Sequence, residues 1–249
     1  MGRKGQWWNT KARSISGQNE SVNDKAKLGT NLIAPITPQI GSVYRYLDEE
    51  KHADDFARGE IYISTLEKCR QYEDPLQGDP HEGHDFYSTG PIITGDGDDP
   101  DLVSIAARIG INMPPGAKNI TISSGSATMV LRHAYVLCTT IGFESDTLQN
   151  TFGKYCVKID NVHEFFHAIS LCLHARVGVL CGMHRAIIYK DRMTVGVEPT
   201  PGPVGFVKPP DKYATQREYR FLWSKEPADD AQPLVISCPG AARYVTRVK

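Results

Sequence analysis

The 249-residue sequence lacks several features that would place it in a familiar class of protein. It has no apolar run that approaches the roughly 18 residues of a membrane span, and its N-terminus, MGRKGQWW, lacks the apolar core of a secretory signal. The six cysteines form no C-x-x-C pair, which argues against a zinc ribbon or a disulfide scaffold. No internal repeat is visible. These absences predict a cytoplasmic protein with no membrane partner.

The sequence also has almost no net charge, with 28 Lys+Arg against 29 Asp+Glu, but the charges are unevenly spread. Residues 48–101 carry 16 acidic and 4 basic side chains. Residues 1–30 carry six basic against two acidic, and residues 208–249 carry eight against five. The composition excludes a uniformly basic nucleic-acid binder and permits a local basic surface for a dinucleotide or a nucleic acid.

The first part of the chain differs in composition from the rest. Residues 1–31 are polar, with little periodicity, which predicts a flexible polar arm or a partner-binding tail. The pair Trp7-Trp8 is unusual in a pure linker. Residues 32–249 have a length suited to a single domain.

Local patterns predict more strands than helices. Helices are predicted over 48–57 and 162–176, and loops over 75–100 and the proline-rich 199–210. Strands are predicted over 43–47, 60–64, 119–123, 127–131, 135–139, 154–159, 186–190, 219–223 and 234–237. Because the strands and helices do not alternate regularly, the order favours an α+β fold.

The string His163-Glu164-Phe165-Phe166-His167 matches H-E-x-x-H on a predicted helix. Two histidines four residues apart can share a zinc ion while the glutamate acts as a base, so a zinc-dependent hydrolase is one alternative. A third protein ligand is missing from the motif. The other interpretation is that His163, His167, Ser170 and His174 form the solvent-facing side of an amphipathic helix.

A second candidate lies in the acidic loop, where His81-Glu82-Gly83-His84 is flanked by Asp79 and Asp85. These side chains are metal ligands in many proteins. The spacing lacks a compact ligand set, so a hydrogen-bonded loop is favoured over a metal site.

A third set of residues is spread along the chain: Arg45 on the first strand, Ser64-Thr65 at the end of the second, and Gln216 and Glu218 before a late strand. An arginine offers a planar fork for a pyrophosphate, and hydroxyls can organise a ribose. A glutamate can bond a ribose hydroxyl and stabilise an oxocarbenium cation, while a glutamine two residues away on a strand orients the acceptor. One carboxylate then suffices, because a positively charged nicotinamide leaves without acid help.

Each of these residues also has a purely structural interpretation. Arg45 can pair with a carboxylate, and Glu218 can pair with Arg217 or Arg220 at a sheet edge.

In combination, the residues resemble the ADP-ribosyltransferase superfamily. The order is YRY at 44–46, a short helix ending at Gly59, IST at 63–65 and QRE at 216–218. The segments 44–83 and 208–223 are also similar to a bacterial family that resembles toxins of phage-defence systems, which ADP-ribosylate nucleic acid. Cys138-Thr139-Thr140 is a rival for the Ser-Thr element.

The resemblance implies a split β-sandwich with peripheral helices and NAD as substrate. It implies that Arg45 contacts the NAD phosphates, that Ser64 and Thr65 support the nicotinamide–ribose pocket, and that Glu218 is the catalytic carboxylate. Gln216 would position the target, and Tyr213, in the loop before it, would stack on a base. The implied partners are NAD, an RNA or DNA acceptor and a neutralising antitoxin, with no metal ion. A non-catalytic partner-binding protein is the remaining alternative.

Overall fold

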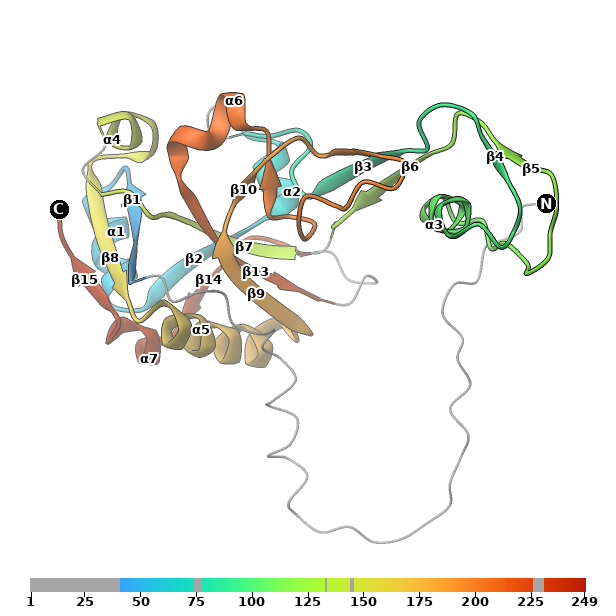
Figure 1. Ribbon diagram of the computed structural model, residues 1–249. Helices are drawn as coiled ribbons and strands as arrows, with labels where there is room; N and C mark the ends of the chain where they lie inside the picture. The colour runs from blue at the N-terminus through green and yellow to red at the C-terminus, as the bar shows by residue number, and fades with distance from the viewer. Residues whose placement is uncertain (1–40, 74–77, 133, 144–145, 226–230) are drawn as a thin grey trace, which may run out of the picture. The chain divides into compact units, whose positions relative to one another are not determined.

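The computed structural model describes residues 41–73, 78–132, 134–143, 146–225 and 231–249. The arm predicted over residues 1–31, with its tryptophan pair, lies outside the described residues. Within them the fold is a mixture of antiparallel strands and few helices (Figure 1), which confirms the α+β class. None of the helices in the described part of the chain combines the length and apolar character that a membrane span requires.

The main sheet has eight strands, and every pairing in it is antiparallel. Its strands are β1 (Ser42–Leu47), β2 (Glu60–Thr65), β7 (Ala134–Thr140), β8 (Tyr155–Asp160), β9 (Cys181–Ala186), β13 (Glu218–Ser224), β14 (Leu234–Ser237) and β15 (Val245–Arg247). The sequence prediction found all of these strands except β9 and β15.

Strand β7 changes partner along one of its edges. On one side it pairs with β13 over its whole length. On the other side its beginning pairs with β2, through Ser64 and Val136, and its end pairs with β1, through Tyr44 and Thr140. Strands β1 and β2 therefore diverge along the same edge of β7, and the sheet splits between them.

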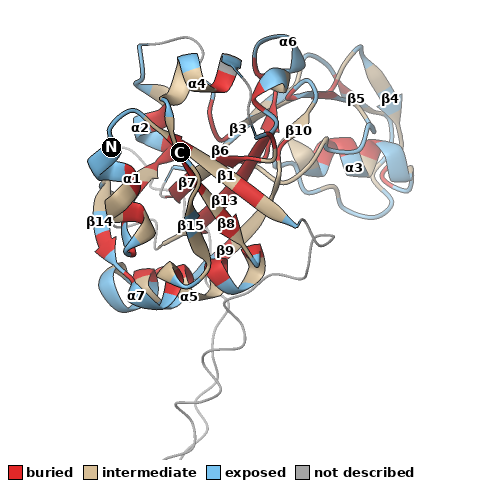
Figure 2. Ribbon diagram, turned by 90° about the vertical axis from the view of Figure 1, so that its left-hand side faces the viewer, coloured by how far each residue is buried: buried red, intermediate tan, exposed pale blue. Residues whose placement is uncertain are grey.

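The alternation along β13 separates two environments. Tyr219, Phe221 and Trp223 belong to the main hydrophobic core, which includes the apolar side of α5 (Val162–Val177). Glu218 and Arg220 point to the other face, because side chains two residues apart on a strand share a face. Figure 2 shows buried residues concentrated in these central strands. Figure 1 shows α5 along one side of the sheet, with α2 (Leu66–Arg70) and α6 (Pro210–Tyr213) on the opposite side.

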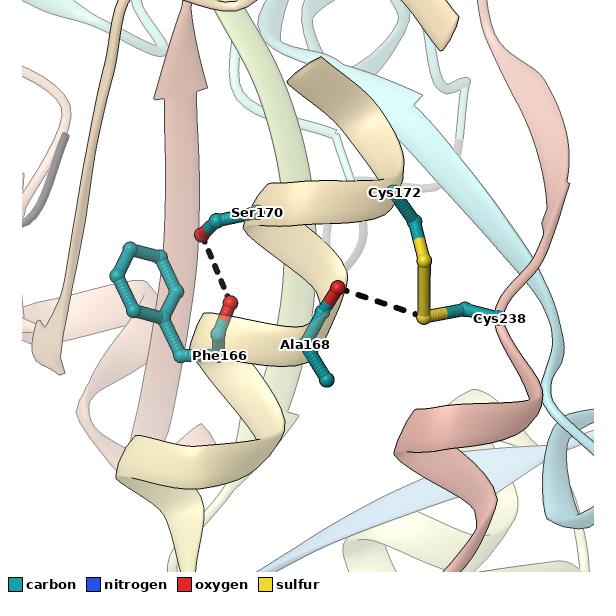
Figure 3. Close-up of a disulfide and its surroundings, with 5 residues drawn as sticks. All are labelled: Phe166, Ala168, Ser170, Cys172 and Cys238. Carbon is teal, nitrogen blue, oxygen red and sulfur yellow. Dashed lines mark hydrogen bonds between the residues drawn. A yellow bond between two sulfur atoms is a disulfide. The ribbon is translucent and has the colours of Figure 1, made fainter. Parts of the chain in front are cut away.

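Helix α5 is held to the end of β14 by a disulfide between Cys172 and Cys238, 66 positions apart in the sequence (Figure 3). The scattered cysteines gave no sign of this pairing.

The polar stripe predicted on α5 is partly wrong, because Ser170 is buried. Its hydroxyl donates to the Phe166 carbonyl and accepts from the Trp223 indole N–H, each at 2.7 Å.

The segment 75–100, predicted as a loop, contains two strands. Three smaller sheets flank the main one: β11-β3-β6, β4-β5 and β10-β12. Their strands are β3 (His84–Ser88), β4 (Ile93–Gly95), β5 (Ile120–Ile122), β6 (Ser126–Val130), β10 (Ile188–Tyr189), β11 (Met193–Val195) and β12 (Val207–Lys208). The remaining helices are α1 (Glu50–Ala57), α3 (Pro100–Arg108), α4 (Asp146–Phe152) and α7 (Pro239–Ala242). A small hydrophobic core around α3 explains why the largely polar segment 75–100 forms strands.

Candidate functional site

A pocket of about 820 Å³ lies where β1 and β2 diverge. Ligand pockets typically measure about 300–1,000 Å³, so this one is large enough for a dinucleotide. Its wall includes four of the side chains that the sequence singled out, although they come from separate parts of the chain: Arg45, Ser64, Gln216 and Glu218. Tyr44, Tyr62 and Tyr72 supply aromatic surface.

Arg45 projects from β1 into this split. Its guanidinium donates a hydrogen bond to the Cys138 carbonyl. Cys138 lies on the stretch of β7 between the part that pairs with β2 and the part that pairs with β1. Within the described residues no carboxylate pairs with Arg45, and the ionisable groups that act on it are the thiols of Cys69 and Cys138 and the phenols of Tyr62 and Tyr72. Burial lowers the pKa of the guanidinium, which nevertheless keeps its charge. The pocket wall therefore holds a partly buried guanidinium that no described carboxylate contacts, contrary to the structural interpretation of Arg45.

The two residues of the Ser-Thr element have different environments. Ser64 lines the pocket, and its hydroxyl oxygen is buried. Thr65 instead caps α2, because its hydroxyl accepts the Lys68 backbone N–H at 3.1 Å. Thr65 is not part of the pocket wall, so its predicted role in the ribose pocket is corrected to a helix cap. Of the rival element, Cys138, Thr139 and Thr140 all line the pocket.

Gln216 and Glu218 both line the pocket, but they do not lie on one strand as the sequence pattern predicted. Gln216 ends a 3₁₀ turn (Ala214–Gln216), and β13 begins only at Glu218. Between them Arg217 has φ 46° and ψ 44°, the left-handed conformation. Their predicted placement on one strand is therefore wrong, although both line the pocket.

The Glu218 carboxylate is 4% exposed and contacts two cations. Its Oε1 accepts from Arg220 Nε at 2.7 Å, and its Oε2 lies 2.7 Å from Lys208 Nζ. The pair with Arg220 agrees with the structural interpretation of Glu218, but it is fully buried and lies beside the pocket. A carboxylate oxygen can accept more than one hydrogen bond, so these two contacts do not exhaust the acceptor capacity of Glu218.

The ion pairs continue away from the pocket through Glu82. Glu82 binds the two terminal nitrogens of Arg220 at 2.7 and 3.0 Å, and lies 3.3 Å from Lys208 Nζ. Asp79 holds Arg192 through both carboxylate oxygens. We call these six residues, three acidic and three basic, the ionic cluster: Asp79, Glu82, Arg192, Lys208, Glu218 and Arg220.

The ionic cluster sets the ionisation of its members. Burial alone would raise the pKa of Glu218 and Glu82, but Arg220 and Lys208 outweigh burial and lower both values. Burial would lower the pKa of Lys208, but Glu218 and Glu82 raise it. Glu218 is therefore an anion over the whole physiological pH range.

Glu82 and Lys208 are the residues that the sequence analysis missed as contributors to this site. The loop 81–84 was considered for a metal, whereas Glu82 anchors the ionic cluster. No local pattern signals the contact between Glu82 and Arg220, because they are 138 positions apart. The only available sign was a carboxylate within a Gly- and Pro-rich segment.

Tyr213 does not have the role predicted for it. The side chain is 4% exposed, and its hydroxyl donates to the Gly78 carbonyl at 2.9 Å. Lys208 Nζ lies 4.9 Å from the ring centroid. The ring is thus part of the support of Lys208 and presents no free face to a base, so the stacking prediction is wrong.

The H-E-x-x-H histidines do not gather metal ligands. His163 Nδ1 lies 3.4 Å from His184 Nε2, and His184 Nδ1 is 2.7 Å from the Tyr219 hydroxyl. Burial lowers the pKa of His184 to about 4. The part of the chain that the structure describes contains no group of three or more His, Cys, Asp or Glu side chains suited to a metal ion.

Comparison with known proteins adds no family assignment. No family model matches the chain, and neither a curated protein nor a solved structure matches it. The resemblance to ADP-ribosyltransferases therefore stays a prediction, and the argument for function depends on the geometry of the pocket.

Proposed function

We propose that this protein is an NAD-dependent ADP-ribosyltransferase, and that the pocket between β1 and β2 binds NAD as a substrate. The observation that carries the proposal is Arg45, a partly buried guanidinium with no carboxylate partner among the described residues, on the wall that also holds Glu218. A charged guanidinium in a desolvated site favours an anion, and its planar fork suits a diphosphate. Ionised Glu218 on the same wall suits a sugar that acquires positive charge.

In the proposed reaction, the bond between C1′ of the ribose and the nicotinamide nitrogen breaks, and its electron pair goes to the nitrogen. Nicotinamide leaves as a neutral molecule, and the sugar becomes an oxocarbenium cation. The acceptor nucleophile forms a bond to C1′ and loses its proton to solvent. Glu218 accepts a hydrogen bond from a ribose hydroxyl and stabilises the cation, Ser64 supports the ribose, and Gln216 orients the acceptor.

The ionic cluster has a positioning role in this proposal. Lys208 and Arg220 each contact one oxygen of Glu218, so the carboxylate has a fixed orientation before the substrate arrives. Fixed charges and hydrogen-bond acceptors contribute most when they need no rearrangement during the reaction.

We infer further that the split antiparallel sheet is the split β-sandwich of the superfamily and that the acceptor is RNA or DNA. A cytoplasmic toxin of this kind in phage defence would require a neutralising antitoxin. These inferences depend on the transferase activity.

The test is the release of nicotinamide from NAD by the purified full chain. Glu218→Gln keeps the size of the side chain and removes its charge, and we expect it to lower the rate on the order of a hundredfold or more. Glu164→Gln is the matched control, because Glu164 lies exposed on α5 and is not part of the pocket wall.

The same pair of variants separates the proposal from the zinc-hydrolase alternative. A hydrolase based on His163 and His167 would lose its activity in Glu164→Gln and keep it in Glu218→Gln. Nicotinamide release that is equal in wild type and Glu218→Gln would contradict the proposed function.

A further inference from the structure

Two stacked aromatic rings lie at one rim of the pocket. Tyr44, which lines the pocket, stacks on Phe143 with ring centroids 4.8 Å apart and an angle of 24° between the planes. Phe143 itself is outside the pocket wall and is 39% exposed. Phe143 therefore packs on a residue of the pocket wall, while much of its own surface faces solvent.

Arg217 lies close to the segment that carries Phe143. It immediately precedes Glu218, and a side chain added at Gly142, next to Phe143, would begin 3.8 Å from Arg217 Cδ. The Arg217 carbonyl accepts the Ile141 backbone N–H at 3.0 Å, which holds the residue in its left-handed conformation. A non-glycine residue in this conformation is strained, and such strain is common at functional sites. The turn places an exposed arginine directly before the proposed catalytic carboxylate and near Gly142, the neighbour of the exposed ring.

The charges around the rings are favourable for a polyanion. Lys249 Nζ lies 5.5 Å from the centroid of Phe143. Arg217 is exposed and forms no ion pair with any residue that the structure describes. The carboxylate on the strand beside Tyr44, Asp160, is already paired with Lys158 at 2.9 Å. Lys249 thus lies over the outer ring of the aromatic pair, and Arg217 lies near Gly142, the residue that precedes that ring.

We propose that Phe143, backed by Tyr44 and with Arg217 and Lys249 close by, is the acceptor subsite for an unpaired base of a single-stranded nucleic acid. This inference rests on the proposed function. A base has an exposed π-face only when it is unpaired, and aromatic side chains with a neighbouring cation are the usual platform for single strands. The base takes the place of the Lys249 ammonium over the exposed part of the Phe143 ring, and Arg217 and the displaced Lys249 neutralise the flanking phosphates. This surface takes the base-stacking role that the sequence analysis gave to Tyr213, which is buried.

The first measurement separates binding from catalysis. Glu218→Gln, which should not turn over NAD, is titrated with fluorescent single-stranded DNA and RNA oligonucleotides in the absence of NAD. Adding Phe143→Ala should weaken binding about fivefold or more, since stacking on an aromatic side chain contributes that much per base. Adding Arg217→Gln should lower the slope of log affinity against log salt by about one contact. Leu171→Ala, which removes a half-exposed apolar side chain from α5, is the matched control.

The second measurement uses the active full chain with NAD labelled in its adenylate part. Phe143→Ala should raise the KM for the oligonucleotide and reduce label transfer to it by a larger factor than it reduces nicotinamide release without oligonucleotide. Phe143→Trp should restore transfer, because it restores the stacking surface.

Two results distinguish the failure of this subsite from the failure of the proposed function. If wild type releases nicotinamide but Phe143→Ala transfers label to oligonucleotides as well as wild type does, or wild type labels only proteins, the subsite is wrong and the function stands. If wild type releases no nicotinamide, both are wrong.

Discussion

Two arginines at the pocket, the fully buried Arg220 and the partly buried Arg45, have opposite electrostatic environments. Arg220, on β13, contacts Glu82 and Glu218 and donates to the Gly205 carbonyl. Arg45, on β1, contacts a single backbone carbonyl, that of Cys138, and has no carboxylate partner within the described residues. They come from strands that lie on opposite edges of β7.

This difference separates a structural charge from a binding charge. A buried ion has a desolvation cost of several kcal/mol, which ion pairs and hydrogen bonds offset. The partners of Arg220 are part of the fold, so its pKa is raised well above its ordinary value. Burial lowers the pKa of Arg45, whose compensation is incomplete in the protein alone. An anion that enters the pocket would complete the charge compensation of Arg45.

The largest expected effect is on stability. Arg220→Met leaves Glu82 and Glu218 buried without their main partner, so we expect the free energy of unfolding to fall by about 3–5 kcal/mol. Urea denaturation followed by circular dichroism measures the change. Arg58→Met, which removes an exposed pair with Asp55, should cost about 1 kcal/mol or less. Equal losses in the two variants would show that the ionic cluster does not stabilise the fold.

A second effect depends on pH. Because the folded pKa of Glu218 is lowered, its contribution is fully present above the unfolded value of about 4.3 and is lost as the pH falls through the folded value. The difference in unfolding free energy between wild type and Glu218→Gln should therefore be constant from pH 7 to 5 and become smaller below about pH 4.3. The buried His184 titrates in both proteins and cancels in the difference. A difference that grows on acidification would contradict the ionised, paired state of Glu218.

The smallest expected effect on stability is that of Arg45→Met. This substitution removes a partly buried charge that no described carboxylate neutralises and keeps an apolar stem of similar length. We expect the free energy of unfolding, measured by urea denaturation, to stay within about 0.5 kcal/mol of wild type or to rise. A loss as large as that of Arg220→Met would mean that Arg45 has a structural partner, and the contrast between the two arginines would disappear.

The sequence predicted what local patterns determine. Alternation of side chains located most of β1, β2, β7 and β13, and helical periodicity located α5. It could not predict β3 and β4, because their segment is polar and depends on pairing with β6 and β5. The strand predicted over 186–190 is divided at Ile187 between β9 and β10.

For the site, the sequence predicted members of the pocket wall but not their surroundings. Arg45, Ser64, Gln216 and Glu218 do line one pocket. Tyr213 was placed wrongly, because a bond to Gly78, 135 positions away, determines its burial. Contacts of this range arise only from the assembled fold, and no spacing in the sequence encodes them.

The most direct test of the account is the affinity for NAD, measured by isothermal titration calorimetry in the Glu218→Gln background, where turnover is suppressed. We predict that NAD binds with one site per chain and that adding Arg45→Met weakens binding about ten- to a hundredfold, the range for lost charge-assisted hydrogen bonds. Unchanged affinity in the double variant, or no binding of NAD by the protein with Arg45 intact, would contradict the claim that Arg45 is a binding charge for a dinucleotide.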